Sequence, residues 1–263
     1  MDIGVLGTGR IARRLVAALA ESPDGHSIRI TRRNAEISAE LVARHPARVG
    51  RSDDMQAILD ASRAVFVCLP GEVALDTLRG LTFRAEQTVI STMMGVRRAD
   101  LAAAVAPAHD VCVTIPLPFV EQGHCPLPVH PDSGVLRCLL GGTNPVIPEA
   151  DEARLSAFWA VAGSMASIVG ELAAIRDWLA ARLDDPRAAE RYVLALFGGY
   201  LHTRPQDGAD RLGEALADLG TPGGLNADML DAVRATGHYD RVSEELDRLH
   251  ARVRDTNDAG QRS

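Results

Sequence analysis

The feature that most constrains the fold is a glycine turn near the start of the sequence, Gly7-Thr8-Gly9-Arg10-Ile11-Ala12, between an apolar strand pattern and an amphipathic helix pattern. In such a turn Gly7 permits a tight bend, Gly9 leaves room for a pyrophosphate against the backbone, and Ala12 allows helix and strand to pack closely. The helix N-terminus then offers free N–H groups and a partial positive charge to phosphates. We therefore predict a dinucleotide site, with a ligand-free turn as the alternative. The predicted pyrophosphate contacts are Gly7, Thr8, Gly9, Arg10 and Ile11.

Further strand patterns follow at intervals, and helical patterns separate them. The strand patterns are Ser27–Thr31, Ala64–Leu69, Thr88–Ser91 and Val111–Ile115. Most are nearly continuous apolar runs, which are typical of strands covered on both faces in a parallel sheet. Strands that alternate with helices predict an α/β, doubly wound sheet of the Rossmann type. Ligands bind at the carboxyl ends of such strands, so we predict that Leu69, Pro70 and Met93 flank a cofactor, with plain loops as the alternative.

The later part of the chain is expected to change character. Val135–Leu140 resembles a late strand, entered through a proline-rich turn around Pro126, Pro128 and Pro131, and Met165–Val169 is a candidate strand to close the sheet. Phe158 and Trp159 are expected to lie in the core of a helix. Beyond Gly170 only helical patterns remain. They are Leu172–Leu183, Pro186–Phe197, Arg211–Leu219, Ala227–Ala235 and a spacing that reaches Val253.

These patterns predict two domains. Residues 1–168 form the NAD(P)-binding Rossmann domain, and residues 169–263 form an all-helical dimerisation and substrate domain. Helices of this size form only a thin layer by themselves, so burial against a second subunit is expected, giving a homodimer or larger homo-oligomer. The polar end from Arg252 to Ser263 is expected to fray.

The end of the second predicted strand indicates which dinucleotide is bound. Enzymes that use NAD usually place an acidic residue there to hold the adenine ribose, but none occurs between Ile28 and Ala35. Guanidinium groups suit a ribose 2′-phosphate instead, as bidentate partners of a dianion. We therefore expect NADP(H) rather than NAD(H), with solvation of the next helix as the alternative role. The predicted 2′-phosphate contacts are Arg32, Arg33 and Asn34.

Composition excludes several classes of function. The chain of 263 residues has a net charge of −7, which does not favour nucleic acid or an anionic membrane as a partner. No apolar run is expected to approach the roughly 20 residues that span a bilayer. The four cysteines have no metal-site spacing, so we expect reduced thiols, no metal and a cytoplasmic location. All 28 basic residues are arginines, which excludes Schiff-base lysine chemistry and a Walker A loop.

A second glycine-rich segment, Thr221-Pro222-Gly223-Gly224-Leu225-Asn226, precedes a helical pattern in the second half. Pro-Gly-Gly cannot lie within a helix at low cost. Backbone N–H groups at the start of the next helix form a good cradle for a carboxylate. A sharp turn between two helices is the alternative. The predicted substrate contacts are Thr221, Gly223, Gly224 and Asn226.

Several motifs, taken in order, resemble the pyrroline-5-carboxylate reductase family over almost the full length of the chain. They are the first glycine turn, Val67–Pro70, Val89–Val96, Ile115–Pro118, Phe158–Glu171 and Thr221–Gly224. The resemblance implies an N-terminal Rossmann domain, a helical domain that interleaves in a dimer, and a role in proline biosynthesis. It also implies NAD(P)H-dependent reduction of a cyclic imine, with the substrate at the dimer interface near the Pro-Gly-Gly loop.

The chain departs from this family at functional positions. Thr221 replaces a serine of the family's loop, and Leu225-Asn226 replace two threonines, so the substrate need not be pyrroline-5-carboxylate. No proton donor can be assigned, because His124 and His130 have no visible partner and are expected to be surface or turn residues. Two alternatives therefore stay open: a ketoacid or hydroxyacid dehydrogenase-like enzyme, and a regulatory protein that binds the cofactor without catalysis. The known dehydrogenases of similar shape use a lysine, which this chain lacks.

Overall fold

The computed structural model describes residues 1–259, and its contacts divide the chain into two compact units. The first unit contains Met1–Ala162 together with the segment that begins at His250, and the second contains Gly163–Leu249. The chain therefore passes between the units twice. The contacts place the first boundary six residues before the expected division at residue 168, and they return the end of the last helix to the first unit.

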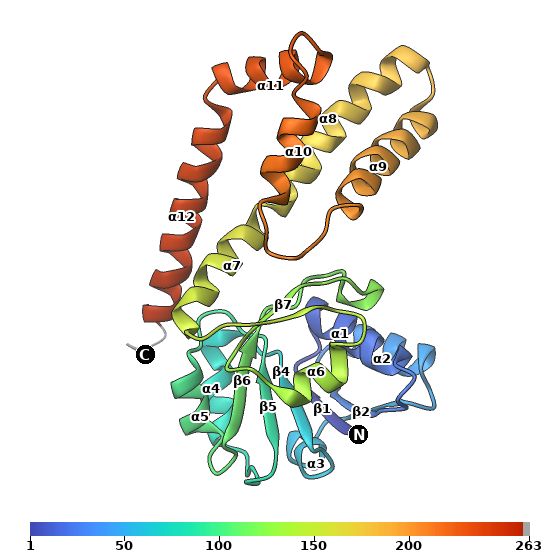
Figure 1. Cartoon of the computed structure of the whole chain (residues 1–263). Helices are drawn as coiled ribbons and strands as arrows, with labels where there is room; N and C mark the ends of the chain where they lie inside the picture. Colours follow the sequence, from blue (N-terminus) through green and yellow to red (C-terminus); the bar gives the residue numbers. More distant parts are fainter. Residues whose placement is uncertain (260–263) are drawn as a thin grey trace. The chain divides into compact units, whose positions relative to one another are not determined.

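The first unit is built on one eight-stranded sheet with the order β3-β2-β1-β4-β5-β6-β7-β8 (Figure 1). All neighbouring strands are parallel except β6 and β7, which are antiparallel. The first six positions follow the strand order of dinucleotide-binding sheets. The strands are β1 (Asp2–Leu6), β2 (Ser27–Thr31), β3 (Val49–Ser52), β4 (Ala64–Val67), β5 (Thr88–Ser91), β6 (Asp110–Thr114), β7 (Leu127–His130) and β8 (Val146–Pro148).

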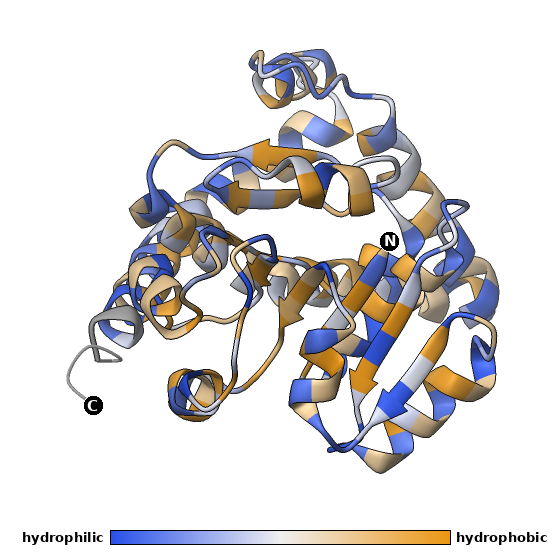
Figure 2. Cartoon of the chain, turned by 90° about the horizontal axis from the view of Figure 1, so that it is seen from below, coloured by the Kyte–Doolittle hydropathy of each residue, from blue (hydrophilic) through white to orange (hydrophobic). Residues whose placement is uncertain are grey.

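Helices cover both faces of this sheet. The helices of the first unit are α1 (Arg10–Glu21), α2 (Ala35–Arg44), α3 (Met55–Asp60), α4 (Gly71–Arg79), α5 (Arg98–Ala104), η1 (Val120–Gln122), α6 (Gly134–Leu140), η2 (Glu152–Arg154) and most of α7 (Leu155–Gly163). The central strands are hydrophobic and the helices carry residues of both kinds (Figure 2). The predicted fold class, an α/β Rossmann-type sheet followed by helices, is confirmed.

Alternate residues of each central strand serve two separate cores. Phe66 and Ile90 pack with α1, α2 and α6 on one face, whereas Val65, Val67 and Val89 pack with α3, α4 and α5 on the other. This alternation follows from the period of two along a strand, and it explains why β4 and β5 are buried at every position.

Three expectations for the later chain are wrong. The segment Val135–Leu140 is not a strand but lies in helix α6, because Ser133 caps the helix by accepting a hydrogen bond from the N–H of Leu136 and the leucines recur at helical spacing. The proline-rich turn contains strand β7, which pairs antiparallel with β6. The candidate strand Met165–Val169 is instead the start of helix α8 (Met165–Leu183).

The expectation that no apolar run reaches membrane-spanning length also needs correction. By length and composition the helical stretch Glu152–Leu183 is long and apolar enough to cross a membrane, although only 6% of its most apolar window is buried. The sequence patterns predict a strand after Gly163 and so divide this run, whereas in the structure a helix follows there. Length and composition do not separate a spanning helix from one that packs against another protein surface.

The second unit is entirely helical in the described residues. Its helices are α8, α9 (Pro186–His202), α10 (Arg211–Leu219), α11 (Leu225–Ala235) and the first half of α12 (His238–Ala259). The pattern Arg211–Leu219 coincides with α10. Helix α12 continues through Arg252 to Ala259, so this part of the predicted frayed end is helical, and residues 260–263 lie outside the described chain.

Candidate functional site: a nucleotide crevice

A crevice with a volume of about 570 Å³ opens at the carboxyl ends of β1, β4 and β5. This is the point where the strand order reverses between β1 and β4, which is where ligands bind in open α/β sheets. Except for Arg32, every residue predicted to bind the cofactor lines it. The lining residues are Gly7, Thr8, Gly9, Arg10, Ile11, Ala12, Arg33, Asn34, Cys68, Leu69, Pro70, Gly71, Thr92, Met93, Met94 and Trp159.

The two glycines of the turn have different structural roles. Gly7 has a φ of +98°, and a Cβ built on it would lie 2.5 Å from the carbonyl oxygen of Cys68. Only glycine fits this position, because both the backbone conformation and the neighbouring strand exclude a side chain. A Cβ on Gly9 would meet nothing within 4 Å, so that position is open space beside the crevice. The protein itself therefore requires glycine at position 7, and only a ligand requires it at position 9.

Two hydroxyl groups hold the turn against the end of β2. The N–H of Gly7 donates to Thr31 Oγ1 at 3.1 Å, and the N–H of Asn34 donates to Thr8 Oγ1 at 3.2 Å. Helix α1 has no side-chain cap and no acidic residue in its first turn. Its first N–H groups and the positive end of its dipole therefore face the crevice, which suits a pyrophosphate.

The two neighbouring arginines after β2 point to different places. Arg33 lines the crevice, whereas the guanidinium of Arg32 forms an ion pair with Asp53 at 2.9 Å and is not among the lining residues. Asn34 also lines the crevice, but its side-chain oxygen already accepts a hydrogen bond from the N–H of Ile37 and caps α2. Of the two neighbouring arginines, Arg33 is thus the one available to a 2′-phosphate.

Trp159 of α7 lines the other end of the crevice, near Met93 on the loop after β5. We expected this tryptophan in the core, and it does pack against the small cluster around Leu155. An apolar helical pattern cannot distinguish a core side chain from one at a cavity wall, so the sequence carried no signal for it.

Cys68 and Thr92 also line this part of the crevice, and Thr92 Oγ1 lies 3.3 Å from Cys68 Sγ. Burial raises the pKa of the Cys68 thiol to about 11, so the sulfur is neutral at physiological pH. A neutral thiol is a poor nucleophile, and the residue therefore serves as part of the wall.

The predicted substrate residues belong to the other unit. Thr221, Gly223 and Asn226 are exposed at the junction of α10 and α11, and Gly224 caps α11. The crevice of the first unit does not include them. Among the described residues no three His, Cys, Asp or Glu side chains gather as a metal site would require, and the four cysteines are free.

A buried carboxylate ties the crevice side of the sheet together. Glu121 of η1 has a side chain only 9% exposed and forms ion pairs of 2.7 Å with both Arg14 of α1 and Arg44 of α2. Burial raises the pKa of Glu121, but the hydrogen bonds from the two arginines outweigh this, and the pKa lies below its ordinary value. The carboxylate therefore joins the loop after β6 to the helix that carries the glycine turn.

Replacing Glu121 by glutamine is expected to lower the free energy of unfolding by about 1–3 kcal/mol at pH 7, because Arg14 and Arg44 lose the negative charge that both pair with. A lowered carboxyl pKa stabilises the fold above the unfolded value of about 4.3, and this contribution is lost as the pH falls through the lower folded value. The difference between wild type and E121Q, measured by urea unfolding, should therefore be full at pH 7 and shrink below pH ~4. E40Q, which breaks the exposed Arg13–Glu40 pair, is the control and should cost less than about 1 kcal/mol. Equal losses in the two variants at pH 7 would contradict the assignment.

Comparison with known families matches only the nucleotide-binding part of the chain. Residues 2–95 match the family described as NADP oxidoreductase, coenzyme F420-dependent. This segment contains the first glycine turn, the arginine pair and the loop with Met93. A comparison with curated protein sequences finds none that matches the chain.

Comparison with solved structures extends over both units. Pyrroline-5-carboxylate reductase from Streptococcus pyogenes is similar with a TM-score of 0.77 and 20% identity, covering 97% of this chain and 98% of that one. Pyrroline carboxylate reductase from Plasmodium falciparum, solved with NADP bound, has a TM-score of 0.80 at 11% identity, with 98% of both chains covered. A reductive aminase from Aspergillus terreus, in complex with NADPH4, cyclohexanone and allyl amine, has a TM-score of 0.59 at 15% identity, covering 98% of this chain and 94% of that one. Over nearly its whole length, the chain has the fold of the pyrroline-5-carboxylate reductases.

Proposed function

We propose that the protein is an NADPH-dependent oxidoreductase that reduces the C=N bond of a cyclic imino acid or a related imine. The observation that carries this proposal is the crevice itself, which is lined by the glycine turn, Arg33, Met93 and Trp159 together. The full-length likeness to pyrroline-5-carboxylate reductases supports the imine class. A role in proline biosynthesis and a cytoplasmic location are further parts of this proposal.

The residues of the crevice fit a phosphorylated dinucleotide. The open space at Gly9 and the uncapped start of α1 suit a pyrophosphate, and Arg33 suits the 2′-phosphate. Leu69, Pro70 and Met93 then flank the cofactor, and NADPH supplies the hydride when it is bound. The NADP-bound Plasmodium relative supports NADP(H) over NAD(H).

Hydride transfer to an imine needs little acid–base catalysis from side chains. A protonated imine is already electrophilic, so orientation beside the nicotinamide and exclusion of water contribute most of the catalysis. This is consistent with a crevice that holds a neutral thiol and no paired acid and base. Thr221, Gly223, Gly224 and Asn226 are proposed to contact the substrate through the N–H groups at the start of α11.

Oxidation of NADPH in the presence of a panel of substrates tests the function. We expect turnover with cyclic imino acids such as 1-pyrroline-5-carboxylate or 1-pyrroline-2-carboxylate, and none with a ketoacid such as pyruvate. Turnover of the ketoacid alone would favour the dehydrogenase alternative. Binding of NADPH by calorimetry without turnover of any imine or ketone would favour a regulatory protein.

The second unit exposes an unusual amount of apolar surface. Helices α8 and α11 bury no residue, and the exposed fractions are 60% at Val169, 58% at Leu194 and 88% at Leu225. Apolar side chains exposed in such number are typical of a surface that another protein covers. We propose that a second copy of the chain covers them, as a homodimer or larger homo-oligomer.

Light scattering at micromolar concentration is expected to give at least the dimer mass. Val169→Asp should shift the protein toward the monomer, because a charge would be buried at the interface. Ile147→Asp is the matched control, since Ile147 is an exposed apolar residue of the first unit, and it should leave the mass unchanged. A monomeric wild type would overturn the assembly.

A further inference from the structure

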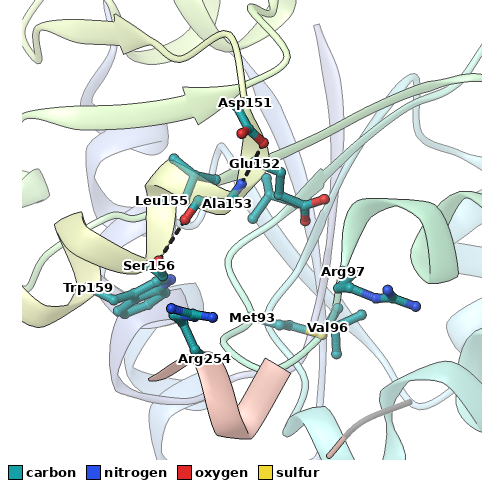
Figure 3. Close-up of a pocket in the computed structure, with 11 residues that line it drawn as sticks. Met93, Val96, Arg97, Asp151, Glu152, Ala153, Leu155, Ser156, Trp159 and Arg254 are labelled. Atoms are coloured by element: carbon teal, nitrogen blue, oxygen red, sulfur yellow. Dashed lines mark hydrogen bonds between the residues drawn. The ribbon is translucent and has the colours of Figure 1, made fainter. Parts of the chain in front are cut away.

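A second cavity, of about 310 Å³, lies next to the nucleotide crevice in the first unit (Figure 3). Met93 and Trp159 line both cavities, so the two cavities adjoin at these residues. Its volume suits a small molecule of a few heavy atoms. Its walls come from the loop after β5, the start of α7 and the end of α12.

The cavity gathers groups of both charges around an apolar floor. Arg254 lies on the side of Trp159 and Ser156, and Glu152 and Arg97 lie on the other side (Figure 3). Arg97 is held by Asp100 through two hydrogen bonds of 2.9 and 3.2 Å. Within residues 1–256, whose side chains the structure describes, no carboxylate forms an ion pair with Arg254, and its side chain lines the cavity.

A half-buried contact one helical turn before Arg254 joins α12 to the start of α7. Ser156 is 4% exposed, and its hydroxyl donates to the carbonyl of Ala153 at 2.6 Å. The 2.8 Å contact between Ser156 Oγ and His250 Nε2 therefore has the imidazole as donor. Residues four apart share a helix face, so the bond at His250 places Arg254 toward the same cavity.

We propose that this cavity binds a small amino or imino acid, with Arg254 as the anchor of its carboxylate. Asp151 and Glu152 lie in the same wall and suit the positively charged nitrogen of the ligand. Glu152 is oriented by accepting the backbone N–H of Arg98 at 2.7 Å. The carboxylate site thus lies in the first unit, beside the nucleotide crevice, and Arg254 supplies a charged partner in place of the threonine hydroxyls that the altered Thr221–Asn226 loop lacks.

This inference rests on the proposed function and gives it a specific substrate group. A ligand held by its carboxylate at Arg254 and by its nitrogen near Glu152 presents its ring toward Met93 and Trp159, the two residues shared with the crevice. Carboxylates close to that nitrogen favour its protonated form, which is the electrophilic one. The pairing predicts that both charges of the ligand contribute to binding.

Calorimetric titration of the full-length protein, saturated with NADP⁺, tests the site with three probes. L-Proline carries both charges, cyclopentanecarboxylate lacks the nitrogen, and pyrrolidine lacks the carboxylate. We expect L-proline to bind best and Arg254→Ala to weaken it about 10- to 100-fold, since one charged hydrogen-bonding partner is lost. The affinity of Arg254→Lys for L-proline should lie between those of wild type and Arg254→Ala, because lysine keeps the charge but lacks the planar guanidinium. Pyrrolidine binding should be the same in wild type and R254A.

Arg252→Ala is the matched control, because Arg252 is an exposed arginine of the same helix and does not line the cavity. It should leave L-proline binding unchanged, and R254A should leave NADP⁺ binding unchanged. A W178F background leaves Trp159 as the remaining tryptophan, so its fluorescence should respond to L-proline as a second readout.

Two results would overturn the site: wild type that does not bind L-proline, and R254A that binds it as tightly as R252A. The outcomes separate the site from the proposed function. A protein that reduces imino acids with the same KM in R254A keeps the function and loses the site. A protein that binds L-proline through Arg254 but oxidises NADPH with no imine keeps the site and loses the function.

Discussion

Gly7→Ala is expected to destabilise the fold, whereas Gly9→Ala is expected to leave the fold stable and weaken NADPH binding. At position 7 alanine must adopt a φ of +98° with its Cβ 2.5 Å from the carbonyl oxygen of Cys68, and neither the turn nor β4 can move far. The free energy of unfolding should fall by about 3 kcal/mol or more. At position 9 the Cβ meets nothing within 4 Å, so the apo protein should unfold at the same denaturant concentration as wild type.

The cofactor then distinguishes the two variants further. Gly9→Ala should weaken NADPH about 10- to 100-fold, because the methyl group occupies the space of the pyrophosphate and separates it from the N–H groups of α1. Urea unfolding without ligand and calorimetry with NADPH measure the two effects independently. Normal NADPH binding by a stable G9A protein would show that the phosphates do not lie at this turn.

Arg33→Ala is expected to lower the affinity for NADPH about 10- to 100-fold while leaving NADH unchanged. Arg33 lines the crevice, and a guanidinium that pairs with a 2′-phosphate has no partner in NADH. The ratio of the two dissociation constants, rather than either one alone, is the quantity that isolates the phosphate contact.

Arg32→Ala provides the matched control one residue away. Its guanidinium pairs with Asp53 at 2.9 Å, so its removal should change the NADPH-to-NADH ratio by less than about threefold. Equal losses of NADPH and NADH affinity in R33A would overturn the phosphate assignment. A larger change of the ratio in R32A than in R33A would transfer it to Arg32.

Arg32 and Arg33 show which part of the site can be predicted from the sequence and which cannot. The pattern after β2 correctly identified a basic end without an acidic residue, but Asp53 stands 21 positions later and its pairing with Arg32 depends on how β2 and β3 lie side by side. Sequence reasoning had no means to separate two identical adjacent side chains. The glycine turn was easier, because its conformation is set by residues that are neighbours in the chain.

The errors in the later chain have a related cause. Val135–Leu140 is a short apolar run, and runs of that length are compatible with a strand or a buried helix. The cap at Ser133 decides in favour of α6. The apolar stretch through Met165–Val169 was assigned to the sheet because its exposure could not be foreseen, and the structure makes it an exposed helix.

By itself the sequence determined the α/β class, the glycine turn, the strand ends that form the crevice and the helical character of the second half. These features follow from local conformational preferences and from the periodicity of apolar residues, which act over a few positions. Only the tertiary structure decided that Arg33 rather than Arg32 faces the crevice, that Trp159 lines its wall, and that Arg254 and Met93 line one second cavity. Those contacts join residues far apart in the chain, and their geometry is set by packing rather than by neighbouring residues.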